Sequence, residues 1–294
     1  MGKRVFLFLA TNLLIVLTLS VVMSLLKIGG YMGPGGQIQI TQLAIFCLIW
    51  GMGASLISLA MSRWIAKQSV GVKLVNGATG QPELDRLYRT VERLSRDAGL
   101  PKTPEVGFYE SPEVNAFATG PSKSMSLVAV STGLLQGMSE PEIEGVLGHE
   151  IAHIANGDMV TMTLLQGVIN AFVMFFARIA AFAARRFVDE RIAGVVSFVV
   201  LIVFQIGFGI LGSMVTAWFS RYREFRADAG GAKFAGRDKM VAALRRLQQN
   251  QEQIDGSHPA LATLKISDRR GMKLFSTHPP LEDRIAALQS QPVF

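Results

Sequence analysis

Four apolar runs, each long enough to cross a membrane, constrain the fold of this chain more than any other feature of its sequence. A helix crosses the ~30 Å hydrocarbon core of a bilayer with about 20 apolar residues. Hydrophobic residues make up 50 % of the chain and the mean hydropathy is +0.35, which is too apolar for an ordinary soluble domain. The runs cover residues 5–26, 41–65, 160–184 and 192–219. We therefore predict a mainly α-helical membrane protein.

Basic residues flank the first two runs and indicate their orientation. Those before the first run are Lys3 and Arg4, and those after the second are Arg63, Lys67 and Lys73. The positive-inside bias puts both groups in the cytoplasm, so residues 1–70 form a transmembrane hairpin. A cleaved signal peptide is the alternative for the first run, but this run is longer than a typical signal core and no small-residue cleavage site follows it.

Residues 160–219 form a second hydrophobic hairpin, whose depth in the membrane stays open. Its loop, Arg185-Arg-Phe-Val-Asp-Glu-Arg191, carries three arginines, which opposes the positive-inside bias, although two acidic residues offset part of their charge. Two full spans and a re-entrant hairpin buried in protein are both consistent with this pattern. In either case the chain returns to the side it left, so residues 71–159 and 220–294 share the cytoplasm.

The stretch after the first hairpin has the pattern of a helix, a small sheet and a second helix. Charged and apolar residues recur at helical spacing over residues 82–98. Runs rich in strand-forming residues follow at 105–109, 114–119 and 126–131. We predict turns between them at Ser111-Pro112 and Gly120-Pro121. This arrangement indicates an α+β domain between the two hydrophobic hairpins.

The second helix of this stretch, at residues 140–155, has well-marked ends. Ser139 and Glu142 have the spacing of a capping box, and Pro141 stands in the first turn, where its missing N–H needs no partner. Asn156-Gly157 is a C-terminal stop signal. Because the limits of this helix are clear, helical periodicity shows which of its residues share a face.

This helix carries the pattern His-Glu-x-x-His. His149 and His153 lie one turn apart on one face, and Glu150 lies about 100° around the axis. Two imidazoles at this spacing bind one zinc ion, which lowers the pKa of a bound water toward ~7, and the carboxylate accepts its proton. The pattern predicts peptide-bond hydrolysis. An accidental match on a surface helix is the alternative, and a chain with four histidines has few chances to produce one.

A catalytic zinc ion usually has three protein ligands, so a third ligand must come from elsewhere in the chain. Glu224 qualifies by topology, because it follows the second hairpin. Asp228 lies one turn later, where it can accept an N–H from a ligand imidazole. The alternative for Glu224 is an ordinary charged residue among three arginines, with no metal to bind. The alternative for Asp228 is a surface residue that pairs with a residue one helical turn away.

Four motifs in this order and spacing make the chain resemble a known family. They are Val114-Asn-Ala-Phe-Ala-Thr-Gly120, His149-Glu-Ile-Ala-His-Ile-Ala-Asn-Gly-Asp158, Arg223-Glu-Phe-Arg-Ala-Asp228, and Thr277-His-Pro-Pro280 with Arg284. They resemble the HtpX family of bacterial inner-membrane zinc metallopeptidases, which is distantly similar to the CAAX prenyl proteases. The resemblance extends over essentially the whole chain. It implies a gluzincin-like α+β metallopeptidase domain, with a small sheet and a zinc-binding helix, combined with transmembrane helices.

The resemblance also implies the roles of the central residues. By their positions in the motifs, His149, His153 and Glu224 match the ligands of one Zn²⁺ per chain. Glu150 matches the catalytic base. Asp228 matches the carboxylate of the family's Glu-x-x-x-Asp pattern, which supports a ligand from outside the metal shell.

Further site residues are implied at the substrate side. Asn115 and Ala116 match an edge strand that lies beside the substrate in related zinc peptidases. His278 and Arg284 match a C-terminal motif, in which His278 either donates to the oxyanion of the reaction or has a structural role before two prolines. His258 also precedes a proline, but no motif includes it and we predict a loop residue. Residues 251–272 are polar and predict a loop before a last short helix.

The function implied is an endopeptidase that cleaves misfolded or damaged membrane proteins, within quality control and the stress response. The implied location is the bacterial inner membrane, with several spans and an active site that faces the cytoplasm. The implied partners are protein substrates, the lipid bilayer and an ATP-dependent membrane protease system. A prenyl-protein protease is the nearest enzymatic alternative.

Several other classes of protein fit the sequence less well. The net charge of +7 is spread along the chain without a nucleic-acid-binding motif, so we expect no nucleic-acid partner. The single cysteine, Cys47, excludes an internal disulfide and a cysteine-based metal site. A transporter would place ionisable residues within its spans, where this chain has almost none besides Arg178. A catalytically inactive scaffold would lack the ligands or the base.

Overall fold

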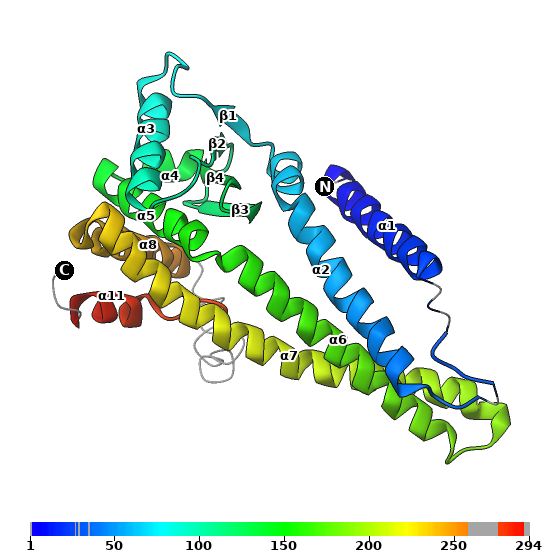
Figure 1. Ribbon diagram of the computed structural model, residues 1–294. Helices are drawn as coiled ribbons and strands as arrows, with labels where there is room; N and C mark the ends of the chain where they lie inside the picture. Colours follow the sequence, from blue (N-terminus) through cyan, green and yellow to red (C-terminus); the bar gives the residue numbers. More distant parts are fainter. Residues whose placement is uncertain (1, 27, 29, 35, 258–275, 291–294) are drawn as a thin grey trace. The chain divides into compact units, whose positions relative to one another are not determined.

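The structure is a computed structural model that describes residues 2–26, 28, 30–34, 36–257 and 276–290. It contains two compact units (Figure 1). The apolar unit comprises Met1–Leu59 and Thr161–Thr216, and the sheet unit comprises Ala60–Val160 and Ala217–Phe294. Each unit is therefore built from two segments that lie far apart in the sequence.

The helices of the apolar unit correspond to the four predicted runs. They are α1 (Gly2–Leu25), α2 (Ile40–Val70), α6 (Asp158–Arg185) and α7 (Glu190–Ala235). By length and composition, these four helices of the described chain can cross a membrane. Many of their large side chains are exposed, among them Phe6, Phe198 and Ile206. This exposure is expected for side chains that face lipid, and the prediction of a mainly α-helical membrane protein is confirmed.

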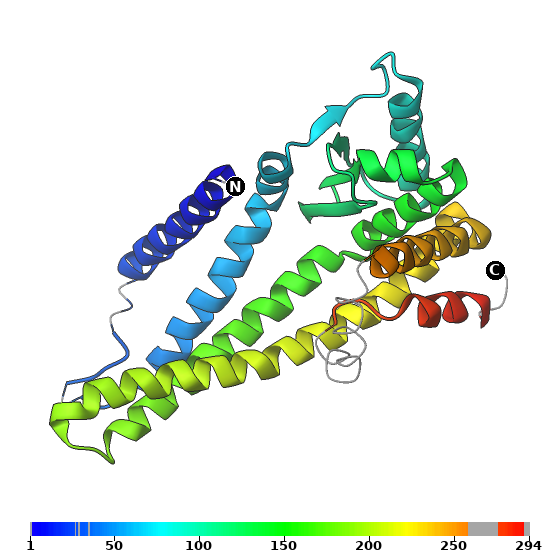
Figure 2. The ribbon, with the colours of Figure 1, turned by 180° about the vertical axis from the view of Figure 1, so that it is seen from behind.

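Small residues allow the helices of the apolar unit to approach closely. A Cβ atom added to Gly51 on α2 would lie 2.6 Å from the backbone nitrogen of Ala171 and 2.8 Å from the carbonyl oxygen of Gly167, both on α6. A Cβ atom on Gly212 of α7 would lie 2.5 Å from a methyl group of Ile169 on α6. Helices α6 and α7 run side by side (Figure 2). Such contacts are typical of helices that associate in lipid, where packing replaces the hydrophobic effect.

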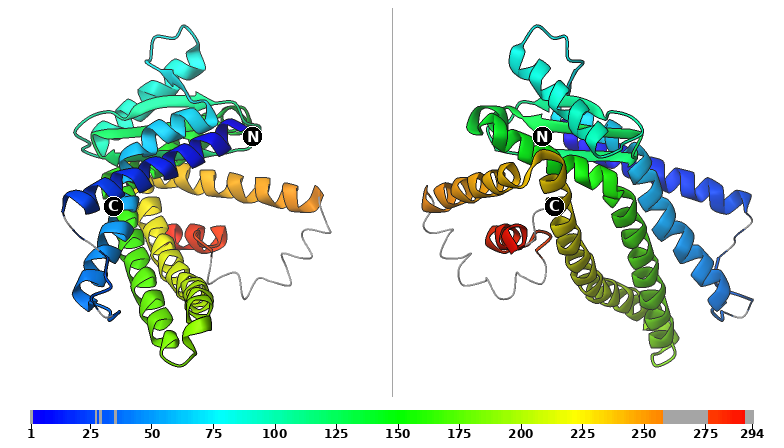
Figure 3. Two further views of the ribbon diagram at one scale, coloured as in Figure 1. Left: turned by 90° about the vertical axis from the view of Figure 1, so that its right-hand side faces the viewer. Right: turned by 60° about the vertical axis from the view of Figure 1, so that its left-hand side comes forward.

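The sheet unit contains a four-stranded sheet with the order β1-β2-β4-β3 (Figure 3). Its strands are β1 (Lys73–Val75), β2 (Glu105–Tyr109), β3 (Ala116–Ser122) and β4 (Met125–Ser131). The two central strands are parallel, and each outer strand is antiparallel to its neighbour. The three predicted strands are present, whereas β1 has three residues and is too short to be recognised from its pattern. β3 forms one edge of the sheet.

The turn predicted at Gly120-Pro121 is wrong, because these residues lie inside β3. The register of β3 against β4 shifts between Thr119 and Ser122, which marks a bulge. Gly120 has a φ angle of 145°, which residues with a side chain rarely adopt. A bulge on an edge strand tolerates proline, because the lost N–H need not bond to a neighbouring strand.

The remaining helices are α3 (Pro82–Asp97), α4 (Thr132–Gly137), α5 (Glu140–Asn156), α8 (Arg237–Ser257) and α11 (Leu281–Ser290). The loop predicted at 251–272 is wrong for residues 251–257, which continue α8. Glutamine and glutamate are good helix formers, so a polar stretch rich in them does not by itself indicate a loop. Residues 258–272, with His258, lie outside the described residues. Helix α7 continues without a break past the predicted apolar run to Ala235.

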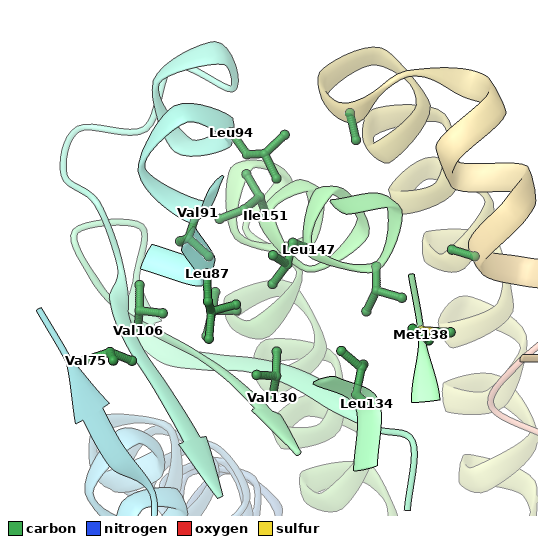
Figure 4. Close-up of a cluster of buried hydrophobic side chains, with 14 of the residues drawn as sticks. Val75, Leu87, Val91, Leu94, Val106, Val130, Leu134, Met138, Leu147 and Ile151 are labelled. Carbon is green, nitrogen blue, oxygen red and sulfur yellow. The ribbon is translucent and has the colours of Figure 1, made fainter. Parts of the chain in front are cut away.

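Helix α5 lies at the centre of the sheet unit. Its apolar residues pack with those of α3 and of the strands into one core (Figure 4). The labelled core residues include Leu87, Val91 and Leu94 on α3, Leu147 and Ile151 on α5, and Val106 and Val130 on the strands. Helix α5 also contacts α8 and β3. The helix with the His-Glu-x-x-His pattern is thereby held on several sides.

Polar contacts define the ends and the neighbours of α5. The predicted capping box is present, and the backbone N–H of Ser139 donates to Oε2 of Glu142 at 2.7 Å. Glu144, in the second turn, accepts hydrogen bonds from Arg93 on α3 and Lys239 on α8. These bonds join three helices at one carboxylate.

We expect Leu147→Ala to lower the free energy of unfolding of the sheet unit by about 2–5 kcal/mol, because the substitution leaves a cavity in a closely packed core. Leu147 is 0 % exposed. Thermal unfolding in detergent measures the effect. Leu74→Ala is the control, since Leu74 is 52 % exposed on β1 and its truncation leaves no cavity. Equal melting temperatures for the two variants would contradict this description of the core.

Candidate metal centre

Helices α5 and α7 touch backbone to backbone beside the His-Glu-x-x-His pattern. A Cβ atom added to Gly231 on α7 would lie 2.9 Å from the backbone nitrogen of His149 on α5. A Cβ atom added to Gly148 on α5 would lie 3.1 Å from the carbonyl oxygen of Gly231. Only glycine permits so close an approach. Glu224 lies two helical turns before Gly231, so this contact brings its carboxylate to the two imidazoles.

His149, His153 and Glu224 form a cluster in which one potential ligand atom of each lies within 4.8 Å of the others. The Nε2 atoms of the two imidazoles are 3.1 Å apart. Nε2 of His153 is 3.4 Å from Oε1 of Glu224, and Nε2 of His149 is 3.6 Å from Oε2. All three residues are buried, Glu224 with an exposed fraction of 1 %. The three predicted zinc ligands therefore meet in space.

The other nitrogen of each imidazole faces a carboxylate. Nδ1 of His149 is 2.9 Å from Oδ1 of Asp228, and Nδ1 of His153 is 2.6 Å from Oδ2 of Asp158. An ionised carboxylate can only accept a hydrogen bond, so we assign an N–H to each Nδ1. Both Nε2 atoms then point toward Glu224 and toward each other. Only a positive charge, a proton or a metal ion, can hold these groups together at such distances.

The electrostatics of the cluster favour a cation. Burial by itself would lower the pKa of His149, but the adjacent carboxylates of Asp228 and Glu224 outweigh this effect and raise the pKa to about 9. Burial would likewise lower the pKa of His153, but its hydrogen bond with Asp158 and the adjacent carboxylate of Glu224 raise it instead. Oε1 of Glu224 is buried and has no hydrogen-bond partner among the described residues. Two imidazoles and a carboxylate oxygen without a donor fit a divalent metal ion such as zinc.

Helix α11 contributes Arg284 to the same site. Nε of Arg284 donates to Oδ2 of Asp228 at 2.7 Å, and Nη2 donates to Oδ1 at 2.6 Å. Nη1 lies 3.6 Å from Oε2 of Glu224. Apolar contacts between α8 and α11 hold the arginine in place; they involve Met240, Leu244, Ile285 and Leu288. Figure 2 shows the red α11 near the orange α8.

His278 lies beside Glu224, and the predicted substrate residues lie at the start of β3. The side chain of His278 is 62 % exposed, and its Nδ1 is 2.9 Å from Oε2 of Glu224. Asn115 is exposed directly before β3, and Ala116 is the first residue of that strand. The backbone of Asn115 is held by Ser131, which accepts its N–H at 3.1 Å and donates to its carbonyl at 2.9 Å.

Two features of the site were not predicted from the sequence. Asp158 belongs to a quoted motif but received no role, although each ligand imidazole needs an acceptor at Nδ1 and the one predicted acceptor, Asp228, can serve only one of them. The glycines between α5 and α7 were not recognised either. Glycine adds nothing to a hydrophobic pattern, so a close helix contact built on it has no periodic signal.

We expect Gly231→Ala to weaken metal binding, because the added methyl group would push α7 and Glu224 away from His149. Overpacking of this kind costs about 1–3 kcal/mol, which corresponds to metal affinity at least about fivefold weaker. Competition with a chelator measures the affinity. Gly209→Ala in the same helix is the control, since its added Cβ atom would have no neighbour within 4 Å. Unchanged affinity in Gly231→Ala would show that the helix contact does not set the geometry of the cluster.

Comparison with known proteins agrees with this geometry. Residues 82–291 match the profile of peptidase family M48. The chain is 53 % identical to a protease HtpX homolog of Bacillus licheniformis, over 99 % of this chain and 100 % of that protein. It is 50 % identical to protease HtpX of Idiomarina loihiensis, over 98 % and 99 % of the two chains.

A solved structure is similar in fold. The crystal structure of Ste24p from S. mikatae matches with a TM-score of 0.60 at 18 % identity, and the match covers 98 % of this chain and 66 % of that one. The resemblance to the HtpX family is confirmed. The chain belongs to peptidase family M48, within its HtpX proteases, and is a membrane metalloprotease.

Proposed function

We propose that the protein is a zinc-dependent endopeptidase of the bacterial inner membrane that cleaves misfolded or damaged membrane proteins. The observation that carries this proposal is the buried cluster of His149, His153 and Glu224, in which a carboxylate orients each imidazole. These three residues would hold one zinc ion. Bound there, zinc supplies a Lewis acid that activates water and polarises the scissile carbonyl group.

Glu150 is the general base in this proposal. It follows His149 on α5 and its side chain is partly exposed, so it can reach both the buried cluster and a bound substrate. Its carboxylate accepts a proton from the attacking water and then donates it to the leaving amine. One residue thus serves both steps of the reaction, which explains why the pattern places the glutamate directly beside a ligand histidine.

The edge strand β3 supports a role in binding the substrate backbone. In the described part of the chain β3 pairs with β4 alone, so its other side can form main-chain hydrogen bonds with an extended peptide. Because β3 packs against α5, a peptide bound there would lie near Glu150. We assign this binding to Asn115 and Ala116. Main-chain recognition suits unfolded segments of many sequences, which is the property that a protease of misfolded proteins needs.

The C-terminal residues complete the site. Arg284 holds Asp228 with two hydrogen bonds and thereby fixes the carboxylate that orients His149. His278 contacts Glu224 from a largely exposed position. This position favours donation to the oxyanion of the reaction over a purely structural role before the prolines.

The membrane location and the orientation rest on separate observations. Apolar helices support a multi-pass protein, and the basic residues beside α1 and α2 support a cytoplasmic site. The role in quality control and the stress response rests on the family resemblance. No observation supports an association with an ATP-dependent membrane protease, so it is not part of this proposal.

We expect Glu150→Gln to lower cleavage of an unfolded model protein by at least about 10²-fold, because it removes the general base but no metal ligand. Glu224→Ala should lower both cleavage and bound zinc. The assay uses the full-length, detergent-purified protein, with zinc content measured by atomic absorption. Chelation of the metal should stop cleavage and added zinc should restore it.

The two variants separate the proposal from its rivals. If Glu150→Gln cleaves as fast as the unsubstituted protein, the mechanism is wrong. If no variant and no condition gives cleavage although zinc is bound, an inactive scaffold becomes the better description.

The orientation of the second hairpin can be tested by thiol labelling. The chain has one cysteine, so Cys47→Ala gives a background without thiols. In this background, Phe187→Cys places a single cysteine in the loop between α6 and α7, where Phe187 is 85 % exposed. We expect a membrane-impermeant maleimide to label this cysteine in intact spheroplasts. Leu74→Cys in the sheet unit is the control and should react only after lysis. Labelling of the loop only after lysis would instead favour a re-entrant hairpin.

A further inference from the structure

A one-residue turn joins the helix of the two histidines to the first apolar helix after it. Helix α5 ends at Asn156 and α6 begins at Asp158. Gly157 between them has φ 71° and ψ 29°, the left-handed conformation that glycine adopts without strain. The reversal at Gly157 turns the Asp158 side chain back toward the last turn of α5, where His153 lies.

The contact between Asp158 and His153 is short and buried. Oδ2 of Asp158 is 2.6 Å from Nδ1 of His153, a distance typical of a charge-assisted hydrogen bond. Asp158 is 3 % exposed. A carboxylate buried to this extent is costly unless it is paired, and the imidazole N–H is the partner that this structure provides.

Asp158 and Asp228 hold the two imidazoles in unequal ways. Asp228 accepts two hydrogen bonds from Arg284, so much of its negative charge is already neutralised. Among the described residues, Asp158 forms no ion pair with an arginine or a lysine. Its full charge therefore acts on His153, which makes the imidazole a stronger electron donor at Nε2.

We propose that Asp158 is a positioning residue of the metal site, which keeps the proton of His153 on Nδ1 and directs Nε2 toward the metal. This inference rests on the proposed zinc site. Outer carboxylates of this kind change metal affinity by about 10- to 100-fold. The loss of Asp158 should therefore reduce zinc affinity by that factor even though the residue does not touch the metal.

A purely structural role is the alternative. Asp158 is the first residue of α6, and a carboxylate there stabilises a helix through the helix dipole. Glu190 has the same position in α7 and is exposed. Glu190→Gln is therefore a matched control, which removes a charge from the start of an apolar helix without touching the metal site.

The experiment compares Asp158→Ala, Asp158→Asn and Glu190→Gln with the unsubstituted full-length protein in detergent. The zinc dissociation constant is measured by chelator competition, and the ligand geometry by the visible absorption of the cobalt-substituted protein. We expect Asp158→Ala to bind zinc about 10- to 100-fold more weakly, with an altered cobalt spectrum. Asp158→Asn keeps an oxygen acceptor of the same shape but no charge, so its zinc affinity should fall less than that of Asp158→Ala. Glu190→Gln should match the unsubstituted protein.

Each outcome bears on one of the two proposals. If Asp158→Ala shows the original zinc affinity and cobalt spectrum, the positioning role is refuted while the protease function stands. If Asp158→Ala does not fold, Asp158→Asn decides, and unchanged affinity in that variant also refutes the role. If the unsubstituted protein binds no zinc, the proposed function itself fails.

Discussion

The direct contact between α5 and α7 is the constraint on which the rest of the site depends. Two predicted ligands lie on α5, and the third lies in the part of α7 that follows the second apolar hairpin. Gly148 and Gly231 leave no side chain between the two backbones, so the distance between Glu224 and the imidazoles is set by contact of main-chain atoms. Sites built on rigid helices hold their geometry better than sites on loops.

Charge balance explains why this site should contain a metal ion. Glu224, Asp228 and Asp158 are buried with exposed fractions of 1 %, 1 % and 3 %. Arg284 neutralises one negative charge, and it lies closest to Asp228. Burial of the remaining carboxylates is costly without further positive charge. Without a metal ion, protons on the imidazoles supply this positive charge. In the active enzyme that we propose, a divalent cation between the Nε2 atoms and Glu224 supplies it.

Residues of the buried cluster also belong to, or directly precede, the apolar helices in the sequence. Glu224 and Asp228 lie on a helix whose first part is long and apolar enough to cross a bilayer. Asp158 begins another such helix, one residue after the end of α5. Helix α7 is continuous from its apolar part to Glu224 and Asp228.

The sequence by itself determined the apolar helices, the capped helix with His149 and Glu150, and the family, because each depends on signals within a short stretch of chain. Asp228 was found in the same way, by its spacing from Glu224. Only the tertiary structure decided that Asp158 contacts His153 and how closely α5 and α7 meet. The contact at Gly231, the turn of Asp158 onto His153 and the bulge at Gly120 all depend on where a neighbouring segment lies. Segments distant in sequence leave no local pattern of their meeting, so these features emerge only when the chain has folded.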